Sequence, residues 1–239
     1  MLRSRRAKRR RAQKEDKTDD LSARLVTVLE PTSAAAEAYR TLRTNLLYAV
    51  VDVPPRVVTL TSPGPREGKS TACANLGVLL AQAGKSALLM DCDFRKPVLH
   101  KIFELRNFRG VVNVVTGEYG IQEVWQEPLP RLKVLPAGPI PPNPAELLGS
   151  RRFAEFLDQM RQEFDYVLID APPVELVSDP VILASQSDGV LLVLDSQNTR
   201  KISLRRSMRS LEAVGANVLG TIMNNVEDGK EQYYYGYGY

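Results

Sequence analysis

The chain has 239 residues, of which 44% are hydrophobic and 25% charged, a composition typical of one large globular domain with tails. It contains no run of about 18 apolar residues and no apolar stretch after its basic start, so we expect neither a membrane span nor a secretory signal. The net charge of +4 comes from residues 1–20, where nine Lys or Arg and four Asp or Glu give a local +5. The rest of the chain therefore sums to −1.

The first 30 residues are expected to form a basic, disordered tail. Its most basic segment runs from Arg3 to Arg11 and could bind anionic lipid, or remain a solvated tail; both interpretations stay open. Nucleic acid is not expected as a partner, because the body of the chain shows no basic excess that would support it.

The body alternates between predicted helices and strands. Helices are expected over residues 31–51, 69–83, 98–103, 111–115, 145–163, 181–184 and 201–214, and strands over residues 56–62, 87–90, 132–135, 166–169, 189–194 and 218–223. The strands are continuously apolar, which indicates an α/β fold with a mostly parallel sheet covered by helices on both faces. In such sheets the ligand lies beyond the carboxyl ends of the strands, where several polar motifs should converge.

The two cysteines, Cys73 and Cys92, each lie in an apolar stretch of a predicted helix or strand. We expect free, buried thiols, which fits a reducing cytosol. With the single His100 they offer too few ligands for zinc.

A phosphate-binding loop is predicted where Gly68-Lys-Ser-Thr71 follows a strand and opens a helix. The helix N-terminus would hold the phosphates, Lys69 would reach the β and γ oxygens, and the Ser70 hydroxyl would bind Mg²⁺. The full pattern G-x-x-x-x-G-K-[ST] is not met, since Pro63 stands at the first glycine position. The predicted nucleotide contacts on this loop are Pro65, Arg66, Glu67, Gly68, Lys69, Ser70 and Thr71.

Two further predicted strands end in acidic residues. One ends at Asp91 with Asp93 close behind, and the other ends at Asp170 after four apolar residues. An aspartate after such a run is the usual second Mg²⁺ anchor, so Ser70, Asp91 and Asp170 are the predicted metal ligands. A tyrosine phenol has a pKa near 10, so a second carboxylate could take its proton during transfer. A capping aspartate and a surface aspartate are the alternative.

The C-terminal segment, residues 229–239, holds five of the nine tyrosines within a glycine-broken run too short to form a core. These are Tyr233, Tyr234, Tyr235, Tyr237 and Tyr239. A nucleotide site and a cluster of phenols in one polypeptide suggest an enzyme that carries its own substrate.

The motifs together resemble the cytoplasmic catalytic domain of bacterial tyrosine kinases of the capsule and exopolysaccharide type, within the deviant phosphate-loop ATPase class. The resemblance spans residues 33–239 and rests on the tyrosine tail and four segments: Ser62 with Glu67-Gly-Lys-Ser-Thr71, Met90-Asp-Cys-Asp-Phe-Arg-Lys-Pro97, Pro142-Asn-Pro-Ala-Glu-Leu-Leu148, and Val167-Leu-Ile-Asp-Ala-Pro-Pro173.

The resemblance implies a kinase domain over residues 31–228, with ATP and Mg²⁺ as cofactors and the tail tyrosines as autophosphorylation sites. It also implies Asp91 as the catalytic base, with Lys69 and Asp93 as its catalytic companions and Ser70 and Asp170 around the phosphates and metal. The family usually has glycine where this chain has Arg66, which leaves the loop geometry open because glycine permits positive φ.

Related ATPases carry an Asn at the end of the last strand that contacts adenine, here Asn224, although a turn residue is an equal alternative. Glu37, Arg40 and Arg43 match a Glu-x-x-Arg-x-x-Arg pattern that marks a subunit interface in ring-shaped assemblies of the family. A solvated ion pair is the alternative. We hypothesise that charge accumulating on phosphorylated tails breaks such a ring.

The resemblance further implies a separate transmembrane activator of the polysaccharide co-polymerase type, and protein substrates in sugar-nucleotide metabolism. It places the protein in the cytoplasm, peripheral at the inner face of the plasma membrane. Two other functions are considered. A partition or division-site ATPase carries a signature lysine where this chain has Gly64, which counts against it. A nucleotide-switched scaffold of polysaccharide assembly is kept open by Arg66.

Overall fold

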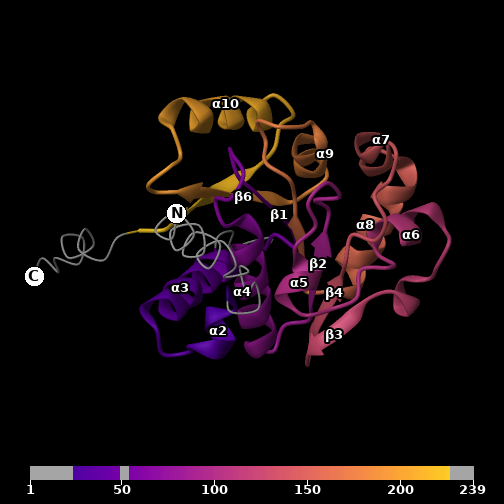
Figure 1. The fold of residues 1–239 in the computed structure, drawn as a ribbon, viewed down its shortest axis with the longest axis horizontal. Coiled ribbons are helices and arrows are strands. Elements are labelled where there is room, and N and C mark those ends of the chain that lie inside the picture. Colours follow the sequence, from indigo (N-terminus) through magenta and orange to yellow (C-terminus); the bar gives the residue numbers. More distant parts are fainter. Residues whose placement is uncertain (1–23, 49–53, 227–239) are drawn as a thin grey trace, which may run out of the picture.

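The computed structural model describes residues 24–48 and 54–226 (Figure 1). Its strands are β1 (Val57–Thr61), β2 (Ala87–Asp91), β3 (Gln126–Leu129), β4 (Leu132–Leu135), β5 (Tyr166–Asp170), β6 (Gly189–Asp195) and β7 (Val218–Asn224). Its helices are α2 (Val26–Leu29), α3 (Ala34–Tyr48), α4 (Lys69–Gln82), α5 (Leu99–Ile102), α6 (Val111–Thr116), α7 (Pro144–Leu148), α8 (Arg151–Glu163), α9 (Asp179–Ser185) and α10 (Lys201–Glu212). None of these helices is long and apolar enough to cross a bilayer.

All seven strands form one sheet in the order β3-β4-β2-β5-β1-β6-β7. Every neighbouring pair is parallel except β3 with β4, which is antiparallel at one edge. Parallel neighbours need crossover connections, and the helices between the strands supply them. The predicted α/β fold with a mostly parallel sheet is confirmed.

The sheet has an apolar core on each face, because successive side chains of a strand point to opposite sides. In β5, Val167 and Ile169 join the core that α8 covers, whereas Leu168 joins the core beneath α4. Figure 1 shows α2, α3 and α4 grouped on one side of the sheet and α9 and α10 on the other. Burial on both faces explains why β1, β2, β5 and β6 are buried at every position and carry mostly apolar side chains.

Three details differ from the sequence-based expectation. The edge strand β3 was not predicted, because its four residues include Pro128, which normally argues against a strand and is tolerated only at an edge. Residues 145–163, expected to be mostly helical, are helical except at a break that was not predicted. They form two helices, α7 and α8, since Gly149 ends the first and the Ser150 hydroxyl caps the second by accepting from the Phe153 N–H at 3.2 Å.

The chain before α3 is the third difference. The tail expected over residues 1–30 is wrong at its end, because residues 26–29 form α2 and Thr27 is buried. The buried Asn75 of α4 fastens this segment: its Oδ1 accepts from the Thr27 N–H and hydroxyl, and its Nδ2 donates to the carbonyls of Arg24 and Thr71. The rest of the predicted N-terminal tail and the tyrosine tail lie outside the described residues.

Both cysteines are free and fully buried, as predicted. Burial, with the neighbouring Asp170 and Asp91 carboxylates adding to it, raises the pKa of the Cys73 thiol. Burial likewise raises the pKa of Cys92, next to Asp91 and Asp170. The two thiols lie in the apolar cores on opposite faces of the sheet, Cys92 in the core that α8 covers and Cys73 in the core beneath α4.

Candidate functional site

The loop between β1 and α4 has the geometry of a phosphate-binding loop. Gly68 adopts a φ of 96° and precedes the first residue of α4, which has no side-chain cap. The backbone N–H groups of Gly68, Lys69, Ser70 and Thr71 donate to no acceptor in the described part of the chain. Uncapped N–H groups at the start of a long helix attract anions. Pro65 and Arg66 are exposed on the outer side of this loop.

Arg66 has a φ of 66°, in the left-handed region that favours glycine. The loop geometry that the sequence left open at Arg66 is therefore a left-handed turn at this residue. Such a conformation costs on the order of 1 kcal/mol in a residue with a Cβ. The start of the loop is held by Ser62, whose hydroxyl donates a hydrogen bond to the Gly64 carbonyl at 2.6 Å.

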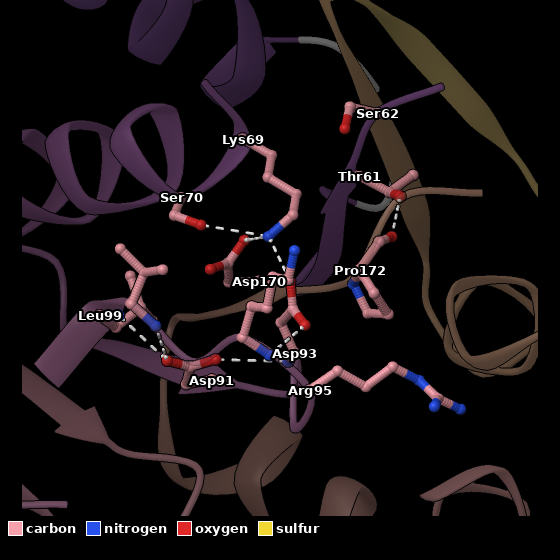
Figure 2. A network of polar contacts seen from close by, with 12 residues as sticks. Thr61, Ser62, Lys69, Ser70, Asp91, Asp93, Arg95, Leu99, Asp170 and Pro172 are labelled. Atoms are coloured by element: carbon pink, nitrogen blue, oxygen red, sulfur yellow. Dashed lines mark hydrogen bonds and ion pairs between the residues drawn. The ribbon is translucent and has the colours of Figure 1, made fainter. Parts of the chain in front are cut away.

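Lys69 turns its ammonium group into a cluster of oxygen atoms (Figure 2). Its Nζ lies 2.9 Å from Asp93 Oδ2, 3.3 Å from Asp170 Oδ1 and 3.2 Å from the Ser70 hydroxyl. Only 8% of Lys69 is exposed. Burial alone would lower the pKa of this ammonium, but the Asp170 and Asp93 carboxylates outweigh it and hold the pKa above its usual range. The lysine is therefore a fixed positive charge at every physiological pH.

The Asp91 carboxylate lies farther from the Lys69 ammonium than those of Asp93 and Asp170 (Figure 2). Its Oδ2 accepts from the N–H groups of Val98 and Leu99 at 2.9 and 3.0 Å, and its Oδ1 accepts from the Asp93 N–H at 3.3 Å. Asp91 is fully buried and stands beside Asp170 in the register of β2 and β5. Burial, with the Asp170 charge adding to it, raises the pKa of Asp91 well above the usual range, although Lys69 and the Leu99 N–H oppose this.

Asp170 is also fully buried, at the end of β5. Burial raises the pKa of its carboxyl group, against the opposing effect of Lys69 and of the Ser70 hydroxyl. Its Oδ2 has no hydrogen-bond partner in the described part of the chain. A buried carboxylate oxygen without a donor is costly, and a hard cation is one group that would satisfy it.

The other side of the loop, toward β6 and β7, carries amides and hydroxyls. Asn224 donates from Nδ2 to the Glu67 carbonyl at 3.1 Å, and its amide fills the space that a Cβ on Gly68 would need. The Thr199 hydroxyl donates to Glu67 Oε1 at 2.9 Å. Burial raises the pKa of Glu67, despite this bond from Thr199. Asn224 therefore supports the loop from behind.

Asp195 ends β6 as Asp91 and Asp170 end their own strands. Hydrogen bonds from the Asn198 amide and from Gln197 N–H, with a further one from Asn225, lower its pKa. Asp195 and Thr199 were missed by the sequence-based analysis. The same signal that exposed the other two strand-end acids, an aspartate after an apolar run, was available for Asp195.

A further buried acid is joined to the loop after β2 by Arg95. Asp179, at the start of α9, is 1% exposed in its side chain and lies 3.5 Å from Arg95 Nε. Neither of its oxygens accepts a hydrogen bond in the described part of the chain. Arg95 thus ties the loop after β2 to the helix that follows β5, and its side chain extends away from Lys69 (Figure 2).

The structure brings Lys69, Ser70, Asp91, Asp93 and Asp170 together at the carboxyl ends of the strands, and it places the residues predicted for a subunit interface elsewhere. Glu37, Arg40 and Arg43 lie on α3 and make no hydrogen bond or ion pair with the loop or the acids in the described part of the chain. Arg40 Nη1 instead lies 2.6 Å from the exposed Glu37 carboxylate. The Arg43 Nε is buried without a partner within the described residues. Their role between subunits stays a prediction.

Comparison with known proteins gives consistent results. A family model described as an AAA domain matches residues 66–217. Tyrosine-protein kinase YwqD of Bacillus subtilis is 40% identical over 215 residues, covering 90% of this chain and 91% of that protein. The kinase domain of Escherichia coli tyrosine kinase ETK superposes with a TM-score of 0.82 at 30% identity, covering 90% of this chain and 84% of that one.

The crystal structure of the chimerical protein CapA2B2 also superposes with a TM-score of 0.82, at 36% identity, covering 85% of this chain and 90% of that one. The septum site-determining protein MinD of Pyrococcus horikoshii is more distant, with a TM-score of 0.61 at 21% identity over 74% of this chain and 72% of that one. At that identity the likeness shows a shared fold and no shared function.

Proposed function

This chain belongs to the family of bacterial tyrosine-protein kinases, and we propose that it transfers the terminal phosphate of ATP to the tyrosines of its own C-terminal tail. One observation carries the proposal: Lys69 lies at an uncapped helix N-terminus with its ammonium held by two buried carboxylates and a serine hydroxyl. The acceptors would be Tyr233, Tyr234, Tyr235, Tyr237 and Tyr239, and the process controlled would be capsule or exopolysaccharide synthesis.

Nucleotide binding would use the groups that the described chain leaves without partners. The N–H groups of residues 68–71 would surround the phosphates, with Pro65, Arg66 and Glu67 on the outer loop. Lys69 would exchange part of its contact with Asp93 and Asp170 for the β and γ oxygens. Asn224 would support the loop and contact the adenine from the end of β7.

The site suits Mg²⁺ as a second cofactor. No three His, Cys, Asp or Glu side chains within the described residues are grouped as a metal cage. Mg²⁺ does not need one, because it is commonly bound by one or two carboxylates together with waters and substrate phosphates. Ser70 and Asp170, whose Oδ2 lacks a donor, would hold the ion, with Asp91 nearby. When bound, the ion would neutralise charge that develops on the transferred phosphoryl group.

In the transfer step the phenol oxygen would form a bond to the γ phosphorus while the bond from that phosphorus to the bridging oxygen breaks, and ADP leaves with the electron pair. The phenol proton would pass to Asp91, because a raised pKa makes its carboxylate a stronger proton acceptor. Lys69 would stabilise charge on the phosphoryl oxygens. Asp93 would hold Lys69 in line through the 2.9 Å ion pair.

We extend the proposal to the assembly. Glu37, Arg40 and Arg43 would form the contact between subunits of a ring, so that one tail reaches a neighbour's site. Accumulating tail phosphates, at about −1.5 to −2 charges each, would then open the ring by repulsion. A separate transmembrane activator of the co-polymerase type would act on it at the inner face of the plasma membrane, aided by the basic segment near residues 3–11. Enzymes of sugar-nucleotide metabolism would be further substrates.

The test is mass spectrometry of the C-terminal peptide after incubation of the full chain and its activator with Mg-ATP. We expect phosphate on the tail tyrosines, and a loss of at least about a hundredfold in Lys69→Met, because the charge that stabilises the transferred group is gone. Lys101→Met, an exposed lysine of α5, is the matched control and should phosphorylate normally. An unmodified tail in the unaltered chain would refute the proposal; ATP hydrolysis without tail phosphate would instead favour the scaffold ATPase.

A further inference from the structure

A hollow of about 490 Å³ lies beside the phosphate-binding loop, on the side away from the acid cluster. One wall is the outer loop with Arg66 and Glu67, and the other is the segment from the end of β6 into α10, with Thr199, Arg200 and Ser203. The acid cluster reaches the opposite flank of the same loop, through Lys69. The wall formed by Thr199, Arg200 and Ser203 therefore has chemistry that neither the proposed nucleotide contacts nor the transfer step uses.

Two arginine side chains, Arg66 and Arg200, line the hollow. Neither the Arg66 nor the Arg200 guanidinium makes a hydrogen bond or an ion pair with any residue in the ranges 24–48 and 54–226, and both side chains are exposed. Arg200 is also the N-cap of the 12-residue helix α10, which has no side-chain cap. The N–H groups of residues 201–203 donate to no acceptor in the described part of the chain. A phosphate group is the anion that two arginine forks and a helix N-terminus match best.

Two carboxylates also face the hollow, and only one of them is saturated. Both carboxylate oxygens of Asp195 accept hydrogen bonds from its own loop or from Asn225, with Asn198 and Gln197 as the donors in the loop. Glu67 is 7% exposed, and its Oε1 accepts from Thr199 while its Oε2 has no donor among the described residues. A buried acceptor of this kind calls for a donor such as a hydroxyl group.

The occupant is indicated by where the described chain ends. Asn225 accepts hydrogen bonds at its carbonyl from the Ser196 hydroxyl and the Gln197 side chain, so β7 ends against the loop that lines the hollow. The last described residue is Val226, and Tyr233 follows seven positions later in the sequence. An extended chain spans at most ~3.3–3.6 Å per residue, so Tyr233 has a reach of up to ~25 Å. The hollow is therefore within reach of the tyrosine segment.

We propose that the hollow binds this chain's own tail once the tail is partly phosphorylated. The phosphate of one tyrosine would contact Arg66, Arg200 and the start of α10, and the phenol hydroxyl of a neighbouring, unmodified tyrosine would donate to Glu67 Oε2. The inference rests on the proposed function, since it needs phosphotyrosine in the tail. It adds a site that binds the phosphorylated tail, which is the product of one transfer. A tail bound there could not enter the active site of a neighbouring subunit.

The experiment uses the full chain with its five tail tyrosines replaced by Phe, so that its own tail carries no phosphate. The probe is a fluorescent peptide of residues 227–239 phosphorylated on Tyr235, and binding is measured by anisotropy. We expect the phosphopeptide to bind at least about tenfold more tightly than the unphosphorylated peptide, because a charge-assisted pair adds to the contact. Arg200→Glu should weaken it by at least about tenfold, while Arg205→Glu, an equal charge change on an exposed site of α10, should change it less than twofold.

Competition separates the sources of phosphate. Inorganic phosphate at the peptide's concentration should displace none of it, and ADP bound at the loop should leave it in place. Equal binding of both peptides, equal loss in Arg200→Glu and Arg205→Glu, or displacement by inorganic phosphate or ADP would each overturn the inference. Because the phosphopeptide is synthetic, these outcomes are independent of whether the chain phosphorylates its own tail.

Discussion

The two flanks of the phosphate-binding loop are built in opposite ways. Toward β2 and β5, three carboxylates and one ammonium are almost completely removed from water, with Lys69 joined to Asp93 and Asp170 at 2.9 and 3.3 Å. Toward β6 and β7, an open hollow is lined by amides, hydroxyls, exposed arginines and the carboxylates of Glu67 and Asp195. The strand ends on both sides carry an aspartate, but Asp170 lacks a donor on one oxygen whereas Asp195 has several.

This difference separates chemistry from binding. Buried charges interact strongly because the local dielectric is low, so the β2–β5 flank can stabilise charge that moves during transfer. The β6–β7 flank is open to water, where isolated charge pairs contribute little, but it offers many directional hydrogen bonds. We therefore expect substitutions on the first flank to change rate and pH dependence, and substitutions on the second to change affinity.

The largest effect is expected for Asp170→Asn, which breaks the buried flank. Phosphate transfer should fall by at least about a hundredfold, since a ligand for the metal and a partner of Lys69 are lost.

The same substitution should change how stability depends on pH. The folded state raises the pKa of Asp91 and Asp170, so above about pH 4 the folded chain holds protons that the unfolded chain has released. Stability of the unaltered chain should therefore decline as pH rises, and the variant should decline less.

Urea unfolding at a series of pH values measures this slope, and Asp165→Asn is the control of opposite sign. Hydrogen bonds from Ser86 lower the pKa of Asp165, so its contribution to stability is present above about pH 4 and is lost as pH falls. The Asp165 variant should lose stability at neutral pH and keep full activity. A steeper decline with rising pH in Asp170→Asn than in the unaltered chain would contradict the picture of a charge-crowded flank.

An intermediate effect is expected for Asn224→Ala on the open flank. It removes the 3.1 Å hydrogen bond to the Glu67 carbonyl and the amide that packs against Gly68. Nucleotide affinity, measured by calorimetry, should fall about fivefold to tenfold, which corresponds to about 1 kcal/mol for one hydrogen bond. The rate at saturating ATP should stay within about twofold, because no charge near the reacting atoms changes.

Asn217→Ala is the matched control, since its Nδ2 donates to the Asp188 carbonyl at 3.0 Å at the opposite end of β7. It should lose similar stability and no nucleotide affinity. Comparing ATP with GTP sharpens the result: equal losses for both would mean that Asn224 acts only on the loop, and a loss of preference for ATP would mean that it also reads the adenine. A lower rate with unchanged nucleotide affinity would contradict the proposal that the open flank acts on binding and the buried flank on transfer.

The smallest effect is expected for Arg66→Gly, at the point where the two flanks meet. Removing the side chain relieves the left-handed conformation and should raise the free energy of unfolding by about 1 kcal/mol, measured in urea. Arg131→Gly is a control with nearly the same φ of 67°, at the turn between β3 and β4. It should be stabilised less, because it also loses the 3.1 Å hydrogen bond from Arg131 Nη1 to the Gly84 carbonyl, and only Arg66→Gly should alter phosphopeptide binding. A loss of stability confined to Arg66→Gly would show that the arginine supports the loop.

The buried flank was largely predictable from the chain, because each of its acids follows an apolar strand. Asp91 and Asp170 stand at strand ends that must meet at one edge of a parallel sheet, and Lys69 begins a helix after a glycine. What the sequence did not reveal is that Asp91 also holds the N–H groups of Val98 and Leu99. Local hydrogen bonds from a loop to a strand end leave no periodic signal.

The open flank was harder to predict, because its contacts join segments far apart in the chain. Thr199 reaches Glu67 across 132 positions, and Asn224 reaches the same loop across 157. The short helix α2 was missed for the same reason, since it is held by a buried Asn75 that belongs to α4. Polar residues in loops carry no pattern that names their partners, so their roles depend on the folded arrangement.

By itself, the order of apolar strands and helices determined the parallel sheet, the place of the phosphate loop and which acids share its edge, since burying apolar side chains on both faces permits few other arrangements. Only the tertiary structure decided which acid contacts Lys69, that Asp170 keeps an unpaired oxygen, and that Arg66 and Arg200 face one hollow. The physical reason is that hydrophobic burial is non-directional and readable as a pattern, whereas hydrogen bonds and ion pairs depend on distances of about 3 Å that only packing sets.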